Sequence, residues 1–90
     1  MTVIAIENAP VNLRGELCKW LLEAKPGVFI GKVSAVVREE LWNSIRNDDR
    51  ITGALIAYSA PTELGFIMEM TGEPTRSIVE LDGLQLIKQA

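Results

Sequence analysis

Thr2-Val3-Ile4-Ala5-Ile6 opens the chain as an apolar run rich in β-branched residues, and it ends on Glu7-Asn8. A short run of this kind predicts a buried strand. The next residues, Ala9-Pro10-Val11-Asn12-Leu13-Arg14-Gly15, lead into a segment with helical periodicity. The sequence therefore predicts an acidic side chain at the end of a strand and a basic one in the first turn of the following helix. Both lie at one rim of the fold.

Residues 12–25 predict the first helix. Leu13, Leu17, Trp20, Leu21 and Ala24 share one helical face. Asn12 is the expected N-cap, and Pro26-Gly27 is the expected end of the helix. Cys18 falls inside this helix and is expected to be a small buried or half-buried side chain.

The rest of the chain predicts an alternation of strands and one more helix. Strands are expected at 28–30, 53–59 and 65–70, with short terminal strands at 77–81 and 84–88 on either side of Asp82-Gly83. A second helix begins at the cap Ser34, and Val37, Leu41, Trp42 and Ile45 form its core stripe. Two helices on one face of an antiparallel sheet make an α+β sandwich. A ferredoxin-like arrangement is the most economical topology, with its second and third strands as one ribbon bent at Gly31.

Composition limits the class of protein. Ninety residues, 48% of them hydrophobic, predict a single domain spanning 1–90. The net charge of −3 disfavours general polyanion binding but leaves room for a local basic patch. The absence of histidine excludes triads that use imidazole, and the single cysteine excludes an intrachain disulfide. No leader and no apolar run of about 18 residues is present, so we expect a cytoplasmic protein with no membrane partner.

Several short motifs occur in order along the whole chain: Glu7-Asn8, Leu13-Arg14-Gly15, Trp20-Leu21-Leu22-Glu23, Gly27-Val28-Phe29-Ile30-Gly31, Val33-Ser34-Ala35, Arg38-Glu39, Trp42, Gly65-Phe66 and Leu81-Asp82-Gly83-Leu84. As an ordered set they resemble the small CRISPR adaptation protein, the smaller partner of the CRISPR integrase, in its type I-E branch. The resemblance implies a ferredoxin-like homodimer placed between two integrase dimers. It also implies binding of a double-stranded protospacer DNA during spacer acquisition.

Glu7 is the candidate catalytic and metal-binding residue. In the family that the chain resembles, an acidic residue at the end of the first strand is the proposed ligand of a metal-dependent nuclease, and Glu7 occupies that position. Two Glu7 carboxylates of a symmetric dimer could hold one Mg²⁺ with waters, because this ion accepts one or two carboxylates. Aspartate is the family's usual residue, and a purely structural carboxylate is the other interpretation. Asn8 is expected to shape the turn before Pro10.

Arg14 is the strongest candidate for a DNA contact. A cation in the first turn of a helix opposes the helix dipole, which suggests another use for it. Helix N-termini also bind phosphate, so Arg14 and Asn12 could share one phosphate site. The resemblance adds Arg76, Lys25 and Arg38 as further DNA-binding residues; solvated charges are the alternative for each.

Trp20 and Trp42 are expected in the core rather than stacked on bases. The apolar tail from Ile78 onward docks on the integrase in the resembling family, and Leu84, Leu86 and Ile87 are the expected anchors. Completion of the sheet is the alternative role of this tail. Three functions follow: a DNA scaffold, a Mg²⁺-dependent endonuclease that acts on DNA or RNA through Glu7, and a small regulatory or toxin-like domain that binds no DNA.

Overall fold

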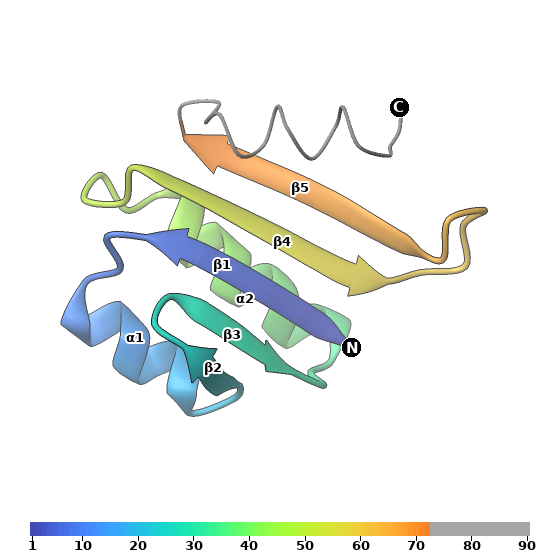
Figure 1. Cartoon of the computed structure of the whole chain (residues 1–90), viewed down its shortest axis with the longest axis horizontal. Helices are drawn as coiled ribbons and strands as arrows, with labels where there is room; N and C mark the ends of the chain where they lie inside the picture. Colours follow the sequence, from blue (N-terminus) through green and yellow to red (C-terminus); the bar gives the residue numbers. More distant parts are fainter. Residues whose placement is uncertain (73–90) are drawn as a thin grey trace.

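The computed structural model of the chain describes residues 1–72. The elements follow in the order β1 (Thr2–Glu7), α1 (Val11–Cys18), β2 (Leu22–Lys25), β3 (Val28–Gly31), α2 (Ala35–Arg46), β4 (Gly53–Ser59) and β5 (Phe66–Gly72). The strands form one sheet in the order β2-β3-β1-β4-β5, with every neighbouring pair antiparallel. Both helices cover the same face of this sheet (Figure 1). The predicted α+β, ferredoxin-like arrangement is confirmed, with β5 added at one edge.

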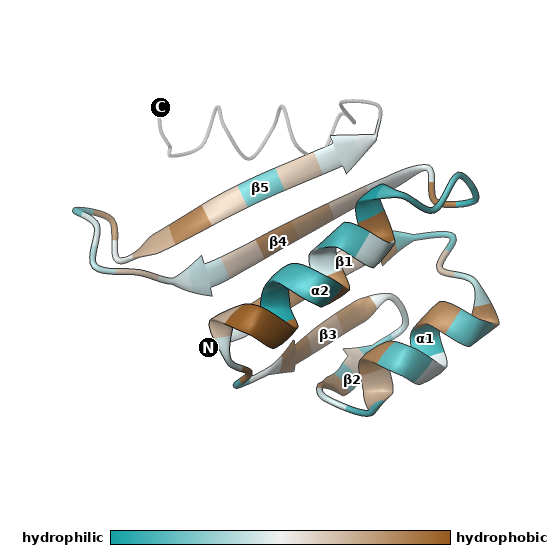
Figure 2. Cartoon of the chain, turned by 180° about the vertical axis from the view of Figure 1, so that it is seen from behind, coloured by the Kyte–Doolittle hydropathy of each residue, from teal (hydrophilic) through white to brown (hydrophobic). Residues whose placement is uncertain are grey.

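The core lies between the sheet and the two helices. β1 is the central strand, and its side chains alternate: Thr2, Ile4 and Ile6 are buried, whereas Val3 and Ala5 are half-buried on the other face. The buried apolar set is Ile4, Ile6, Leu13, Leu17, Leu21, Phe29, Leu41, Trp42, Ile45, Ala54 and Ile56. The predicted core stripe of α2 is confirmed, and hydrophilic residues occupy its outer face (Figure 2).

The start of α2 follows directly from its sequence. The Ser34 hydroxyl accepts a hydrogen bond from the Val37 N–H at 3.2 Å, which satisfies one of the free amides of the first turn. Arg46 stands in the last turn, where a cation is favoured by the helix dipole. These local signals agree with the apolar spacing, and the helix has the bounds that they predict.

The first helix is much shorter than the sequence predicts. α1 ends at Cys18, and the N–H groups of Trp20 and Leu21 both donate to the Leu17 carbonyl, at 3.0 and 2.8 Å, as the chain turns away. Residues 22–25 then form the edge strand β2 instead of a last helical turn. The Trp20 side chain, expected in the core, is half exposed, and Cys18, expected to be buried or half-buried, is exposed.

The turn at Pro26-Gly27 connects β2 to β3 and does not end a helix. Gly27 has φ +82°, and a Cβ there would lie 2.6 Å from the Ile6 carbonyl oxygen, so only glycine fits. The Gly27 carbonyl accepts a hydrogen bond from the Ile6 N–H at 2.8 Å, which ties the turn to the end of β1. The ribbon predicted to bend at Gly31 therefore bends here, one strand earlier.

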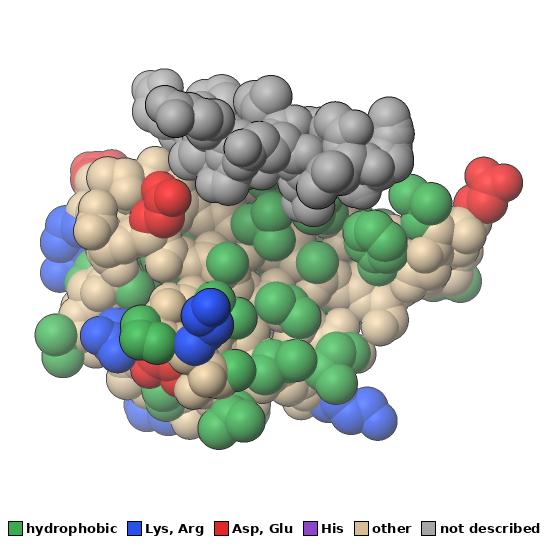
Figure 3. All heavy atoms as spheres, viewed as in Figure 1, with side chains coloured by type: hydrophobic (Ala, Val, Ile, Leu, Met, Phe, Trp, Pro, Cys, Tyr) green, Lys and Arg blue, Asp and Glu red, His purple; other side chains and the backbone are tan. Residues whose placement is uncertain are grey.

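The face of the sheet opposite the helices carries mainly apolar side chains. Cross-strand partners point to the same face of a sheet, so the pairing places these residues together: Val3, Ala5, Val28, Ile30, Leu55, Ala57, Met68 and Met70. We call this set the open face. Figure 3 views it directly and shows apolar side chains gathered over the middle strands. An antiparallel sheet with one solvated face normally alternates apolar and polar residues, so this surface is unusual.

β4 and β5 form the predicted antiparallel hairpin. Their register runs from Gly53↔Gly72 to Ser59↔Phe66. The predicted strands at 77–81 and 84–88 lie outside the described residues.

Candidate nucleic-acid interface

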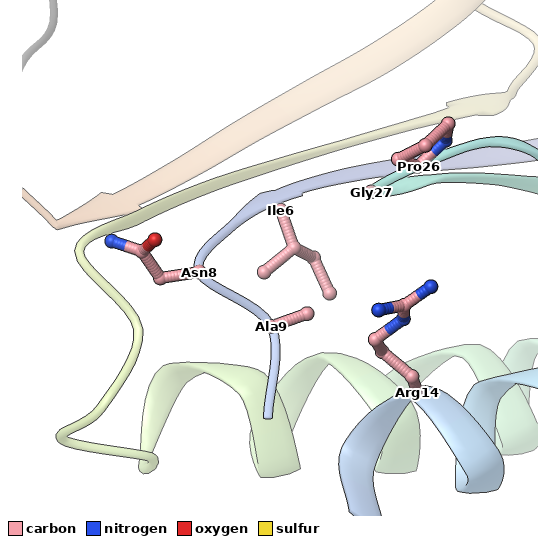
Figure 4. Close-up of a pocket in the computed structure, with 6 residues that line it drawn as sticks. All are labelled: Ile6, Asn8, Ala9, Arg14, Pro26 and Gly27. Carbon is pink, nitrogen blue, oxygen red and sulfur yellow. The ribbon is translucent and has the colours of Figure 1, made fainter. Parts of the chain in front are cut away.

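The end of β1, the start of α1 and the β2–β3 turn meet at one rim of the molecule. Together they form a pocket of about 270 Å³ that is open to solvent. The lining residues are Ile6, Asn8, Ala9, Arg14, Pro26 and Gly27. Figure 4 shows the Arg14 side chain reaching from α1 toward the Pro26-Gly27 turn. Arg14 lines this pocket, whereas Glu7 does not: it pairs with Gly53 of β4.

Arg14 does not stand alone in this pocket. Its Nη2 donates to both carboxylate oxygens of Glu23, at 3.3 Å to Oε1 and 3.1 Å to Oε2. The Arg14 side chain is 45% exposed, and the Glu23 side chain is 19% exposed. A guanidinium has five N–H donors, so one nitrogen engaged with Glu23 leaves others for an incoming anion.

Glu23 is fixed by the turn that follows it. The Gly27 N–H donates to Glu23 Oε2 at 3.1 Å. This backbone hydrogen bond is the largest cause that holds the pKa of the Glu23 carboxyl below its ordinary value. Burial opposes it, and the Arg14 guanidinium lowers the pKa further. Glu23 is therefore ionised at neutral pH, and it places a negative charge beside the Arg14 guanidinium.

Glu7 is an exposed carboxylate at the end of β1 with one hydroxyl neighbour. The Thr52 Oγ1 donates to Glu7 Oε1 at 3.5 Å and accepts from the Asn8 Nδ2 at 3.1 Å. Asn8 has φ +59°, a left-handed conformation that asparagine tolerates better than most residues. Asn8 thus makes the turn that the sequence predicts for it, and its side chain links β1 to the residue before β4.

A single chain supplies little for a metal ion at this point. Within residues 1–72, no cluster of three or more acidic or cysteine side chains is close enough to hold one. Mg²⁺ prefers an octahedron of oxygens and often takes only one or two carboxylates, with water as the other ligands. Glu7 could supply one such carboxylate.

The other predicted DNA-binding residues divide between the two ends of the sheet. Asn12 is exposed in the first turn of α1, where Pro10 and not Asn12 is the N-cap. Lys25 is exposed at the end of β2, next to the turn. These two residues accompany Arg14 at the same rim.

Arg38 lies at the opposite end of β1. Its guanidinium carbon is 3.7 Å from the centre of the Tyr58 ring, and Tyr58 pairs with Thr2. The Arg38 side chain is only 18% exposed, and its Nε lies 3.6 Å from a Glu39 oxygen, too far for a good hydrogen bond. The structure thus separates Arg38 from the Arg14 pocket and engages it in a cation–π contact.

Arg76 and the predicted partner-binding residues Leu84, Leu86 and Ile87 lie outside the described residues.

The chain matches the family model described as CRISPR-associated protein (Cas_Cas2CT1978) over residues 1–86. The chain belongs to this CRISPR-associated family. A CRISPR-related role follows. In the part of the chain that the structure describes, neither helix has the length and apolar character needed to cross a membrane.

Two residues of this rim escaped sequence reasoning. The sequence pattern places Glu23 in a helix that does not extend so far, and it does not predict Thr52 as a neighbour of Glu7. Glu23 carried a signal, because Pro26-Gly27 three residues later is also typical of a hairpin turn. Thr52 carried none, since its position depends on the β1–β4 register, in which Glu7 pairs with Gly53.

Proposed function

We propose that this protein is a DNA scaffold of CRISPR adaptation. In this role a homodimer holds the backbone of a double-stranded protospacer between integrase dimers. The observation that carries the proposal is the position of Arg14 in a solvent-open pocket at the rim of the fold, with Asn12 and Lys25 beside it. Contacts of this type to phosphates position a duplex without reading its sequence.

The open face supports the homodimer. Eight apolar residues on four adjacent strands form one continuous surface, and large exposed apolar patches usually mark an interaction site. A second copy presents the same surface, so a two-fold contact pairs apolar side chains with apolar side chains. Such a dimer repeats the Arg14 pocket by symmetry.

The finer parts of the proposal rest on the sequence motifs. The ordered motifs from Glu7-Asn8 to Leu81-Asp82-Gly83-Leu84 support the type I-E branch and, with it, the integrase as partner. In that assignment Arg76 adds a second phosphate contact, and Leu84, Leu86 and Ile87 dock on the integrase. The membership of the chain in a CRISPR-associated family supports the integrase and DNA as its partners.

Arg14→Ala tests the scaffold role. We expect duplex binding to weaken by about 1.5 kcal/mol or more, roughly tenfold, because a charge-assisted hydrogen bond to phosphate is lost. The loss should be equal on unrelated sequences, and the dependence of log Kd on log salt should become shallower. Fluorescence anisotropy on two duplexes of different sequence, at several salt concentrations, measures both effects.

Lys32→Ala is the matched control for that experiment. Lys32 is an exposed cation just after β3, at the far end of the sheet from Arg14. The Lys32→Ala substitution should leave the affinity for the duplex nearly unchanged, although it alters the net charge by the same amount as Arg14→Ala. Equal losses for the two variants, or a loss confined to one DNA sequence, would contradict the proposed phosphate contact.

A Mg²⁺-dependent endonuclease is the second candidate function, and the position of Glu7 favours it. Because side chains alternate along β1, Glu7 points to the same side of the sheet as Val3 and Ala5. In a dimer formed through the open face, the Glu7 side chain of each protomer therefore points toward the partner. Mg²⁺ bound there would activate a water for attack on a phosphodiester.

Glu7→Gln separates this function from the scaffold. We expect cleavage of a labelled duplex in the presence of Mg²⁺ to be abolished, because the amide no longer supplies a charged ligand. Dimer mass and duplex affinity should be unchanged in the same preparation. Persistent cleavage by the variant would assign the activity to another centre.

A further inference from the structure

Arg14 has an acidic partner, the Glu23 carboxylate. Both oxygens of the Glu23 carboxylate accept from Arg14 Nη2, at 3.1 and 3.3 Å. A DNA phosphate oxygen would accept hydrogen bonds from the same guanidinium N–H groups. Glu23 therefore occupies part of the guanidinium that the proposed function assigns to DNA.

Glu23 is held in place independently of Arg14. Its Oε2 accepts the Gly27 N–H at 3.1 Å, and Gly27 in turn is bonded to the end of β1 through the Ile6 N–H at 2.8 Å. The carboxylate is also the less exposed partner of the pair, at 19% against 45% for Arg14. The carboxylate therefore keeps one hydrogen bond at the turn if its contact with Arg14 is broken.

We propose that Glu23 competes with the DNA backbone for Arg14 and sets the phosphate affinity of this pocket. This inference rests on the proposed DNA contact of Arg14. A phosphate bound to Arg14 lies within a few ångströms of the fixed carboxylate, and two like charges at that separation repel each other. DNA must also break the Nη2 contacts or use only the remaining N–H groups of the guanidinium.

The competition keeps the protein from binding every polyanion that it meets. Phosphate contacts carry no sequence information, so an unopposed arginine would hold any nucleic acid. With Glu23 in place, a single phosphate gains little at one pocket. A duplex that reaches the pockets of both copies at once still binds, because the second contact is intramolecular. Glu23 thus favours a duplex long enough to span the dimer.

Glu23→Gln is the direct test. Glutamine keeps the size of the side chain and an amide oxygen for the Gly27 N–H, and it removes the charge. We expect duplex affinity at low salt to increase about three- to tenfold. In the Arg14→Ala background the same substitution should change the affinity by less than about twofold, because there is no guanidinium left to release.

Glu16→Gln is the matched control. Glu16 lies on α1 and pairs with Lys19 at 3.4 Å, so its substitution changes the net charge equally without touching Arg14. If Glu23→Gln tightens DNA binding no more than Glu16→Gln does, the inference is overturned. The scaffold role would still stand in that case, provided that Arg14→Ala weakens DNA binding. Weaker binding by Glu23→Gln would also overturn it, because Glu23 would then position Arg14 for DNA.

A measurement on the unaltered protein checks the same point without any variant. The ¹³C signal of the Glu23 carboxyl carbon reports its contact with Arg14. We expect this signal to shift in step with saturation by a short duplex, since DNA takes over the guanidinium. A Glu23 signal that stays fixed while the Arg14 side-chain signals move would overturn the competition.

Discussion

Trp42→Ala is expected to lower the free energy of unfolding by about 3–5 kcal/mol, the usual cost of removing a large aromatic side chain from a packed core. Trp42 is 2% exposed and is the largest side chain in the core between α2 and the sheet. Alanine at this position leaves a cavity that neighbouring side chains fill only in part. A domain of this size is typically stable by only about 5–15 kcal/mol, so the variant loses a large share of its stability.

Trp20→Ala is the matched control, with the same chemical change in the same protein. The Trp20 side chain is 50% exposed, so the expected loss is about 1 kcal/mol or less. Urea denaturation followed by far-UV circular dichroism gives both values; protein concentration is kept constant because a dimer links stability to concentration. Equal losses for the two tryptophans would contradict the burial of Trp42 and the exposure of Trp20 described above.

Most elements could be predicted from local pattern alone. β1, α2, β4 and β5 are found where the apolar spacing places them, and Ser34 caps α2 as its position before the apolar stripe suggests. The largest error concerns residues 19–25. Leu22-Glu23-Ala24-Lys25 consists of strong helix formers, and apolar residues continue the helical spacing of α1. Pairing with β3 overrides this local preference. The Pro26-Gly27 turn between the two strands is its local signal, and the same dipeptide is equally typical of a helix end.

The pairing of charges at the site depends on the same residues 19–25. In one continuous helix, residues nine positions apart lie about 180° apart around the axis and roughly 13.5 Å apart along it, so Arg14 and Glu23 would not meet. The actual turn after Cys18 reverses the chain and brings the two charges into contact. Sequence reasoning therefore placed Arg14 at the rim correctly but found it without its carboxylate partner.

Leu55→Asp is expected to convert the proposed dimer into a monomer. Leu55 lies at the middle of the open face, with Ala5 of β1 opposite it on one side and Met70 of β5 on the other. A two-fold contact places two new carboxylates in the interface, and each buried charge without a partner costs several kcal/mol. We expect the dissociation constant of the dimer to rise by about 1,000-fold or more, equivalent to about 4 kcal/mol.

Val36→Asp is the control for that substitution. Val36 is 70% exposed on α2, on the opposite side of the sheet, and an acid near a helix N-terminus is favourable. Sedimentation equilibrium should find this variant dimeric and Leu55→Asp monomeric, with circular dichroism confirming that both are folded. Two dimeric variants would place the interface on another surface of the protein.

The monomer also tests how the dimer binds DNA. The dimer presents the Arg14 pocket twice, and the slope of log Kd against log salt is proportional to the number of phosphates contacted. If one duplex bridges both pockets, the slope for Leu55→Asp should fall to about half that of the unaltered protein. An unchanged slope would mean that a single protomer makes all of the contacts. The dimer would then serve to connect the integrase copies rather than to measure the length of the duplex.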